Sequence, residues 1–178
     1  MSGWSALLPA WATVLVAAGV AKLRRPDETA RALGQALGGR LAGWRAVVRV
    51  GAGAEIVIGA ASLLVGGRLA AGAVAASYGG FALYVGWARL TRSPLATCGC
   101  LGEPDTPPTW SHAALCAAAA VTAGLAGAGP PPPSLFSMLT TLGPWSAAYL
   151  LAGAAAVYGT ILVLSAGPRL ASLRRPAR

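Results

Sequence analysis

The sequence predicts an all-α membrane protein, a polytopic bundle of about five transmembrane helices with a short interfacial helix after the first. Hydrophobic residues make up 56% of the 178 residues and charged residues only 11%, against about 25% in soluble domains. The apolar residues fall into blocks of about 20, the length that a membrane helix needs. Arginines cluster at the ends of these blocks, where they orient helices and meet anionic headgroups. The net charge of +9 therefore does not indicate nucleic-acid binding.

Residues 4–21 form the first predicted span, which ends at the basic cluster starting with Lys22. The N-terminus has no Lys or Arg and no clear cleavage site, so we expect this span to remain as an anchor. Residues 27–37 predict a short helix, because Pro26 and two acidic residues suit a first helical turn. It is too short and too polar to span a membrane, so we expect it to lie along the membrane surface.

The rest of the chain alternates apolar blocks with polar or proline-rich breaks. Thr109 offers an N-cap for the fourth span, and the prolines at 130–133 predict a stiff break. The remaining predicted spans cover residues 46–65, 69–87, 111–128 and 145–166, with a polar loop at 93–108 and a short surface helix at 134–142. We therefore expect a four-helix membrane core over residues 1–128, a Pro-rich linker over 129–144, and a fifth transmembrane helix with a basic tail over 145–178.

With five spans, the first loop, the loop at 93–108 and the C-terminus share one side of the membrane. That side holds every Lys and Arg near the end of a span except Arg68. The positive-inside rule makes it cytoplasmic and places the N-terminus outside. The sequence thus predicts a multi-pass protein of the plasma membrane.

The polar loop contains Cys98-Gly99-Cys100. Two thiols that flank one residue can form a small, strained disulfide, which is easily reduced, and Gly99 allows the sharp backbone bend. Alternatives are incidental thiols or half of a metal site, but zinc takes about four ligands. Cys98, Cys100 and His112 supply only three, so we expect a redox pair and no metal.

Three further residues could support this chemistry. His112 could lower a thiol pKa or move a proton, or be a polar residue at a helix start. Cys116 lies inside the fourth span, where a small hydrophobic role or a relay thiol are the alternatives. Glu55 is an acid at membrane depth, which is costly and often functional. Arg49 lies six positions earlier, off the same helical face, so we expect a partner from another helix or a neutral carboxyl.

Three aromatic residues of the third span, Tyr78, Tyr84 and Trp87, suit a core or interface role, with a quinone pocket as the alternative.

Several of these stretches resemble one family. Residues 19–26, Gly-Val-Ala-Lys-Leu-Arg-Arg-Pro, are similar to the Gly-x-x-Lys-Leu exit of the first span in MauE and DoxX-like membrane proteins. Glu55 followed by Gly59 is similar too. Phe81-Ala82-Leu83-Tyr84 leads to a Cys-Gly-Cys-Leu-Gly sequence that resembles the family's Cys-Gly-Cys-Phe-Gly, with Leu101 replacing Phe. The resemblance covers about residues 4–128, and the layout also resembles the vitamin K epoxide reductase plan.

The resemblance implies a role beside a periplasmic thioredoxin-like partner, in disulfide formation or in maturation of the methylamine dehydrogenase small subunit. It assigns the redox pair to Cys98 and Cys100. A methylamine substrate does not follow. The resemblance also creates a conflict, because a periplasmic partner needs the thiols outside, whereas the arginines place them inside.

The sequence therefore predicts a membrane thiol–disulfide redox protein that works with a thioredoxin-like protein. The sequence assigns no cofactor with certainty, and a quinone at the other end of the electron path is one candidate. A second hypothesis is a non-enzymatic docking or chaperone subunit with structural thiols. A third is a small transporter or metal handler that uses Glu55, Cys98 and Cys100.

Overall fold

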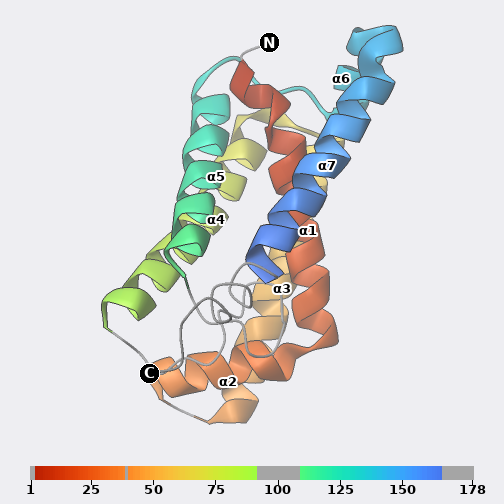
Figure 1. Ribbon diagram of the computed structural model, residues 1–178. Helices are drawn as coiled ribbons and strands as arrows, with labels where there is room; N and C mark the ends of the chain where they lie inside the picture. Colours follow the sequence, from red (N-terminus) through yellow and green to blue (C-terminus); the bar gives the residue numbers. More distant parts are fainter. Residues whose placement is uncertain (1–2, 39, 92–108, 166–178) are drawn as a thin grey trace.

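The computed structural model describes residues 3–38, 40–91 and 109–165, which are mostly helical and contain no strand. Four long helices form a bundle, and α2 lies across one of its ends (Figure 1). Two further helices, α6 and α7, follow the bundle along the chain. The helices are α1 (Leu8–Arg24), α2 (Pro26–Leu37), α3 (Leu41–Leu64), α4 (Gly67–Leu90), α5 (Trp110–Ala128), α6 (Leu135–Leu142) and α7 (Ser146–Ser165), with short 3-10 turns at Gly3–Ala6 and Gly143–Trp145.

Five segments of the described chain are long and apolar enough to cross a membrane. They are Gly3–Arg24, Leu41–Leu64, Gly67–Leu90, Trp110–Ala128 and Leu135–Val163. This finding confirms the predicted polytopic helical bundle, and the chain is a multi-pass membrane protein. The short helix predicted after the first span is also present, with Pro26 and two acids in its first turn.

The second span begins at Leu41, five residues before the predicted start. Its first turns carry Arg45, whose Nε and a terminal nitrogen donate to the two carboxylate oxygens of Asp27 on α2 at 2.5 and 2.9 Å. Trp44 donates from Nε1 to the Gly38 carbonyl at 2.6 Å. Contacts with α2 therefore extend α3 beyond its apolar block, which the sequence pattern alone does not reveal.

The bundle consists of two closely packed helix pairs, α1 with α3 and α4 with α5. Glycines allow the first pair to approach, because a Cβ on Gly19 would lie 2.7 Å from the Ala52 carbonyl oxygen. Trp11 joins the two pairs. Its indole donates to the Thr122 hydroxyl at 2.9 Å, and its carbonyl accepts a 2.8 Å hydrogen bond from the Tyr78 hydroxyl.

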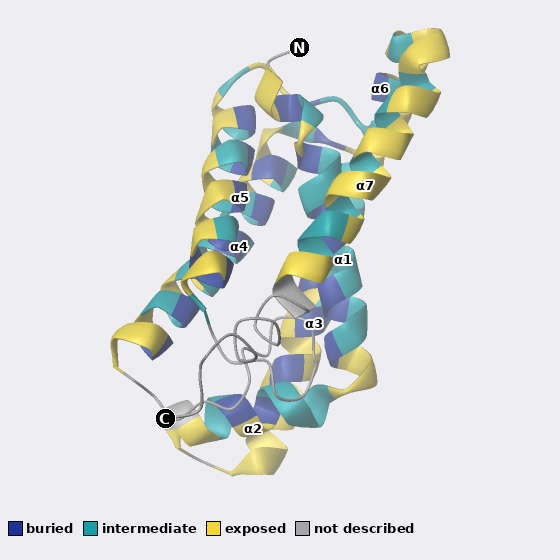
Figure 2. Cartoon of the chain, viewed as in Figure 1, coloured by how far each residue is buried: buried dark blue, intermediate teal, exposed yellow. Residues whose placement is uncertain are grey.

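Helix α7 lies against α1 and leaves most of its surface exposed (Figure 2). No residue in the apolar window of its span is buried. The Tyr149 hydroxyl ties it to the bundle by donating to the Ala6 carbonyl at 2.7 Å. The proline-rich break before it is non-helical, as predicted, and the Gly67 N–H donates to the Pro132 carbonyl at 2.8 Å. Apart from its contacts with α1 and α6, most of the apolar surface of α7 is exposed.

Candidate functional site

Cys98 and Cys100 lie outside the described residues, in the segment 92–108. The helix ends on both sides of that segment lie together. The Arg89 guanidinium lies over the Trp110 ring, 6.0 Å from its centroid, and Val85 packs with Ala113. The described helix ends before and after that segment therefore lie at the same corner of the bundle.

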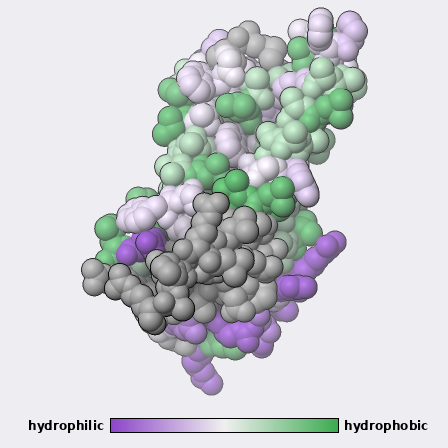
Figure 3. Space-filling view, viewed as in Figure 1, coloured by the Kyte–Doolittle hydropathy of each residue, from purple (hydrophilic) through white to green (hydrophobic). Residues whose placement is uncertain are grey.

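Helix α2 packs against this corner, because Ala32 of α2 contacts Ala88 of α4 beside Tyr84. Basic side chains gather at the same end, and Figure 3 shows hydrophilic surface there and mainly apolar or neutral surface further along the bundle. At the other end Arg68 donates from Nε to the Gly129 carbonyl at 3.1 Å. The described arginines at the α2 end are Arg24, Arg25, Arg31, Arg40, Arg45, Arg49 and Arg89.

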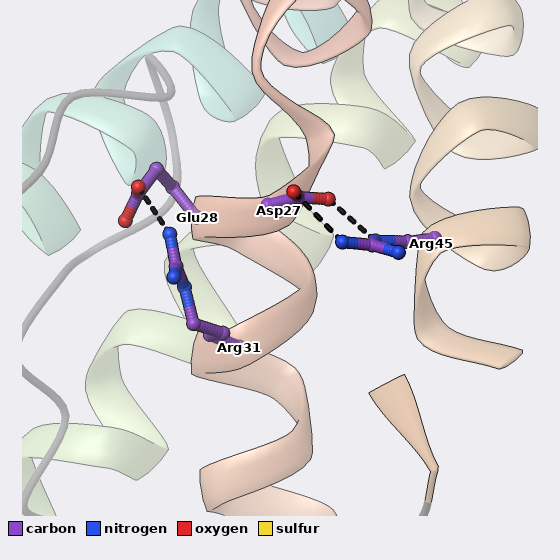
Figure 4. A network of polar contacts seen from close by, with 4 residues as sticks. All are labelled: Asp27, Glu28, Arg31 and Arg45. Atoms are coloured by element: carbon purple, nitrogen blue, oxygen red, sulfur yellow. Dashed lines mark hydrogen bonds and ion pairs between the residues drawn. The ribbon is translucent and has the colours of Figure 1, made fainter. Parts of the chain in front are cut away.

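One ion pair joins α2 to α3 at this end, and a second lies within α2 (Figure 4). Arg45 of α3 donates two hydrogen bonds to Asp27. Arg31 pairs with Glu28, and both residues lie on α2. The hydrogen bond from Arg45 is the largest influence on the Asp27 carboxyl, and it holds the pKa of Asp27 below its usual range. The carboxylate form therefore favours the docked position of α2.

A buried ion pair lies between α1 and α3. The Lys22 Nζ is 2.5 Å from Oε1 of Glu55, and the two side chains are 6% and 10% exposed. Nζ also lies 4.4 Å from the centroid of the Phe81 ring on α4. This arrangement confirms the expectation that Glu55 takes its partner from another helix. The sequence analysis did not identify Lys22 as that partner, because Lys22 was assigned to the basic cluster that ends the first span.

The close approach of α1 and α3 creates this pair. A Cβ on Gly19 would lie 3.2 Å from Cβ of Glu55, so a glycine one turn before Lys22 brings the two helices together. Gly59, one turn after Glu55, serves the same purpose, since its Cβ would lie 2.7 Å from the Ala12 carbonyl oxygen. The two glycines and the two charged residues thus belong to one interface between α1 and α3.

A cavity of 390 Å³ adjoins the ion pair and is bounded by α1, α2, α3 and α4. Its walls are mainly apolar. Oε2 of Glu55 is buried and has no hydrogen-bond partner among the described residues. The polar and aromatic side chains of its lining are Lys22, Thr29, Glu55, Ser77, Phe81 and Tyr84.

His112 and Cys116 lie on α5, away from this cavity lining. His112 is buried, and its Nδ1 is 2.6 Å from the Thr109 hydroxyl, which also accepts from the His112 backbone N–H. Thr109 is therefore the N-cap that the sequence predicted. Cys116, one turn further along, belongs to the apolar core that also contains Tyr78.

The three aromatic residues of α4 have different environments. Tyr78 is a core residue, Tyr84 lines the cavity, and Trp87 is 40% exposed. Within the described part of the chain, no three His, Cys, Asp or Glu side chains come together as metal ligands. The structure thus brings Glu55 together with Lys22. It places His112 at the start of α5, near the end of the thiol segment, and His112 does not line the cavity beside the ion pair.

Comparison with known proteins gives one match. The family model described as "Methylamine utilisation protein MauE" matches residues 4–130. No curated protein and no solved structure matches the chain. The matched region begins in the turn before α1 and ends just after α5, so it includes the four-helix bundle, α2 and the segment with the two cysteines.

Proposed function

The chain belongs to the MauE family of membrane proteins, and from this premise we propose that it exchanges disulfides with exported proteins through Cys98 and Cys100. The observation that carries the proposal is a Cys-Gly-Cys sequence between two helix ends that meet at one corner of the bundle. The single residue between the two cysteines limits the separation of their sulfurs. Such a pair is suited to switching between dithiol and disulfide.

The proposed reaction is a two-step exchange. A thiolate of the partner attacks the Cys98–Cys100 disulfide, which breaks the S–S bond and forms a mixed disulfide. The second thiolate of the partner then displaces the protein's sulfur. The partner loses two electrons and two protons and gains a disulfide, while Cys98 and Cys100 become thiols. His112, at the start of α5, would take up or return a proton at this end of the bundle.

The partner that suits this exchange is a thioredoxin-like protein, whose own cysteine pair would pass the disulfide on. The description of the family further suggests a role in methylamine utilisation, as a maturation factor rather than an enzyme acting on the amine. We also propose that residues 1–128 hold the activity, with 129–144 as a linker and 145–178 as an additional membrane anchor.

Mass spectrometry of the full-length protein in graded glutathione buffers tests the thiol pair. We expect a Cys98–Cys100 bridge that forms and disappears across the series, and loss of exchange in Cys98→Ser and Cys100→Ser variants. Cys116→Ser is the matched control, because Cys116 is a buried core residue on α5. Failure of any bridge to form, or full exchange by the serine variants, would contradict the proposal.

The side of the membrane is tested separately. A membrane-impermeant maleimide applied to intact cells should label Cys98 and Cys100 if they serve exported proteins. Labelling only after the cells are opened would assign the pair to the cytoplasm, in agreement with the positive-inside rule, and would contradict an exported partner.

A docking subunit is the second candidate function, and the surface of α7 favours it. This helix buries no residue of its apolar window in the bundle, so another membrane helix could pack on it. In that case a variant without cysteines would retain its partner in a pull-down and would also retain its function. Retention of the partner together with loss of exchange would instead favour the redox role.

A further inference from the structure

The 390 Å³ cavity beside the Lys22–Glu55 pair has the size of a small-molecule site, for which about 300–1,000 Å³ is typical. Its lining includes exposed residues of two membrane-spanning helices, Val47 and Gly51 on α3 and Gly80 on α4. Because these helices face lipid, the cavity is accessible from the bilayer. An apolar molecule dissolved in the membrane can therefore reach it without crossing water.

The inner wall of the cavity presents one acceptor and one donor at the same place. Within the described residues, Lys22 Nζ has one hydrogen bond, to Oε1 of Glu55, and faces the Phe81 ring, so an ammonium with three donors retains donor capacity there. Oε2 of Glu55 is buried without a hydrogen-bond partner in the described chain. A buried oxygen of this kind is stabilised by a ligand that donates a hydrogen bond.

These features select among the molecules that a membrane offers. An acyl chain would fill the apolar walls but would leave Oε2 of Glu55 without a donor. A metal cation would be repelled by the positive charge of Lys22. A ring that carries oxygens fits both requirements, since its hydroxyl form donates to Glu55, its carbonyl form accepts from Lys22, and its face packs on Phe81 and Tyr84.

The cavity between α1 and α7 shows the contrast. It is larger, at 530 Å³, but none of the described residues that line it is charged. Among its described lining residues, two of the three hydroxyls donate within the protein, Tyr149 to the Ala6 carbonyl and Thr13 to the Pro9 carbonyl, and the third belongs to Tyr158, which is 65% exposed. That cavity suits acyl chains, whereas the one at the ion pair suits a polar head on an apolar tail.

We propose that the cavity bounded by α1, α2, α3 and α4 binds the ring of a lipid-soluble quinone or quinol, with Lys22 and Glu55 as its polar contacts. Binding itself does not require the thiols. A redox role for the ligand rests on the proposed function: the Cys98–Cys100 dithiol would lose two electrons and two protons to become a disulfide, and the quinone would take them up to become the quinol.

Binding of decyl-benzoquinone and its quinol to the full-length protein, in phosphatidylcholine nanodiscs free of quinone, tests the site. Decylbenzene, which has the tail and ring but no oxygens, is the control ligand. We expect saturable binding of the quinone and quinol, and at least tenfold weaker binding of decylbenzene. Equal affinity for all three would overturn the proposal, because it would reduce the site to a lipid cavity.

Neighbouring glycines provide matched variants. Gly80 lines the cavity and Gly79 does not, and a Cβ at either position would have no atom within 4 Å. We expect Gly80→Leu to weaken quinone binding at least tenfold and Gly79→Leu to leave it unchanged. The same comparison is repeated on α3, where Gly51→Leu is the cavity variant and Gly53→Leu is the control. Misfolding of one variant then does not decide the result. Undiminished binding in both cavity variants would overturn the proposal.

Glu55→Gln gives a readout that packing alone would not change. Replacing a carboxylate by a neutral amide weakens the acceptor for a quinol hydroxyl, so the affinity ratio of quinol to quinone should fall severalfold. An unchanged ratio would contradict the contact with Glu55. The Cys98→Ser/Cys100→Ser protein should bind the quinone normally. Binding without any thiol bridge would contradict only the proposed function, and a thiol bridge without binding would contradict only this inference.

Discussion

The Nζ atom of Lys22 lies 2.5 Å from Oε1 of Glu55, although 33 residues separate the two side chains along the chain. The pair fixes the end of α1 against the middle of α3, and both side chains are at least nine-tenths buried. In such surroundings each charge depends on the other, since an isolated buried charge is strongly destabilising. The pair therefore fixes the register of the two helices as well as the wall of the cavity.

The pair should show strong coupling in a double-mutant cycle. Lys22→Met and Glu55→Gln should each lower the free energy of unfolding by about 3–5 kcal/mol, the typical effect of breaking a buried pair. The double variant should lose less than the sum of the two. Denaturant unfolding in detergent measures these values. Glu28→Gln, which breaks the more exposed pair with Arg31, should change stability by about 0–1 kcal/mol. Strictly additive losses at Lys22 and Glu55 would disprove the coupling.

Gly19→Ala should destabilise the contact between α1 and α3. The new Cβ would lie 2.7 Å from the Ala52 carbonyl oxygen, a backbone atom that cannot rotate away, so we expect a loss of about 1–3 kcal/mol. Gly53→Ala is the control on α3, where nothing lies within 4 Å, and it should be neutral or stabilising by about 0.5–1 kcal/mol. Thermal unfolding of both variants tests this difference, and an equal change in both would contradict it.

Gly66→Ala should disturb the turn between α3 and α4. Gly66 has φ +72° and ψ −150°, a backbone region that is almost restricted to glycine, and its Cβ would lie 2.6 Å from the Pro132 carbonyl oxygen. Gly67→Ala shares the positive φ but has open space around its Cβ. We expect both to destabilise the protein, and Gly66→Ala to do so more, in a thermal-shift assay. Equal losses would show that the contact with Pro132 contributes nothing.

The pair between Asp27 and Arg45 should make the docking of α2 sensitive to pH. The pKa of Asp27 is lowered in the folded protein by the hydrogen bond from Arg45. A lowered folded pKa stabilises the folded state above the unfolded pKa, and this contribution is lost as the pH falls through the folded value. The stability difference between the wild type and Asp27→Asn should therefore be present near neutrality and shrink below about pH 4. A pH series of thermal unfolding at low salt measures it, and a difference that persists at low pH would contradict this role.

Removal of the cap at α5 should affect the start of that helix. Thr109→Val keeps the shape of the side chain but removes the hydroxyl that accepts from the His112 N–H, so we expect a loss of about 1 kcal/mol. Thr109→Ser retains the hydroxyl and should stay close to the wild type. Hydrogen exchange at the first turns of α5 provides the measurement. Equal exchange in the valine and serine variants would exclude the capping role.

The sequence by itself determined the features that depend on neighbouring residues. The length of an apolar block predicts a span, Pro26 with two acids predicts the start of α2, and Thr109 predicts the cap of α5. Each of these depends on forces within one helix or at its end. The start of α3 was misplaced by five residues for the opposite reason, since its first turns are stabilised by Asp27 on another helix.

Only the tertiary structure decided which charged residues meet. Lys22 ends an apolar block and Glu55 interrupts another. Neither position in the sequence reveals that the two side chains lie at the same level of the bundle. Their contact depends on how closely α1 and α3 approach, which the glycines at 19 and 59 allow through backbone contacts between helices. The cavity next to the pair likewise exists because α1, α2, α3 and α4 converge on it. Local composition therefore determined the helices, whereas the packing of distant segments created the ion pair and the proposed binding site.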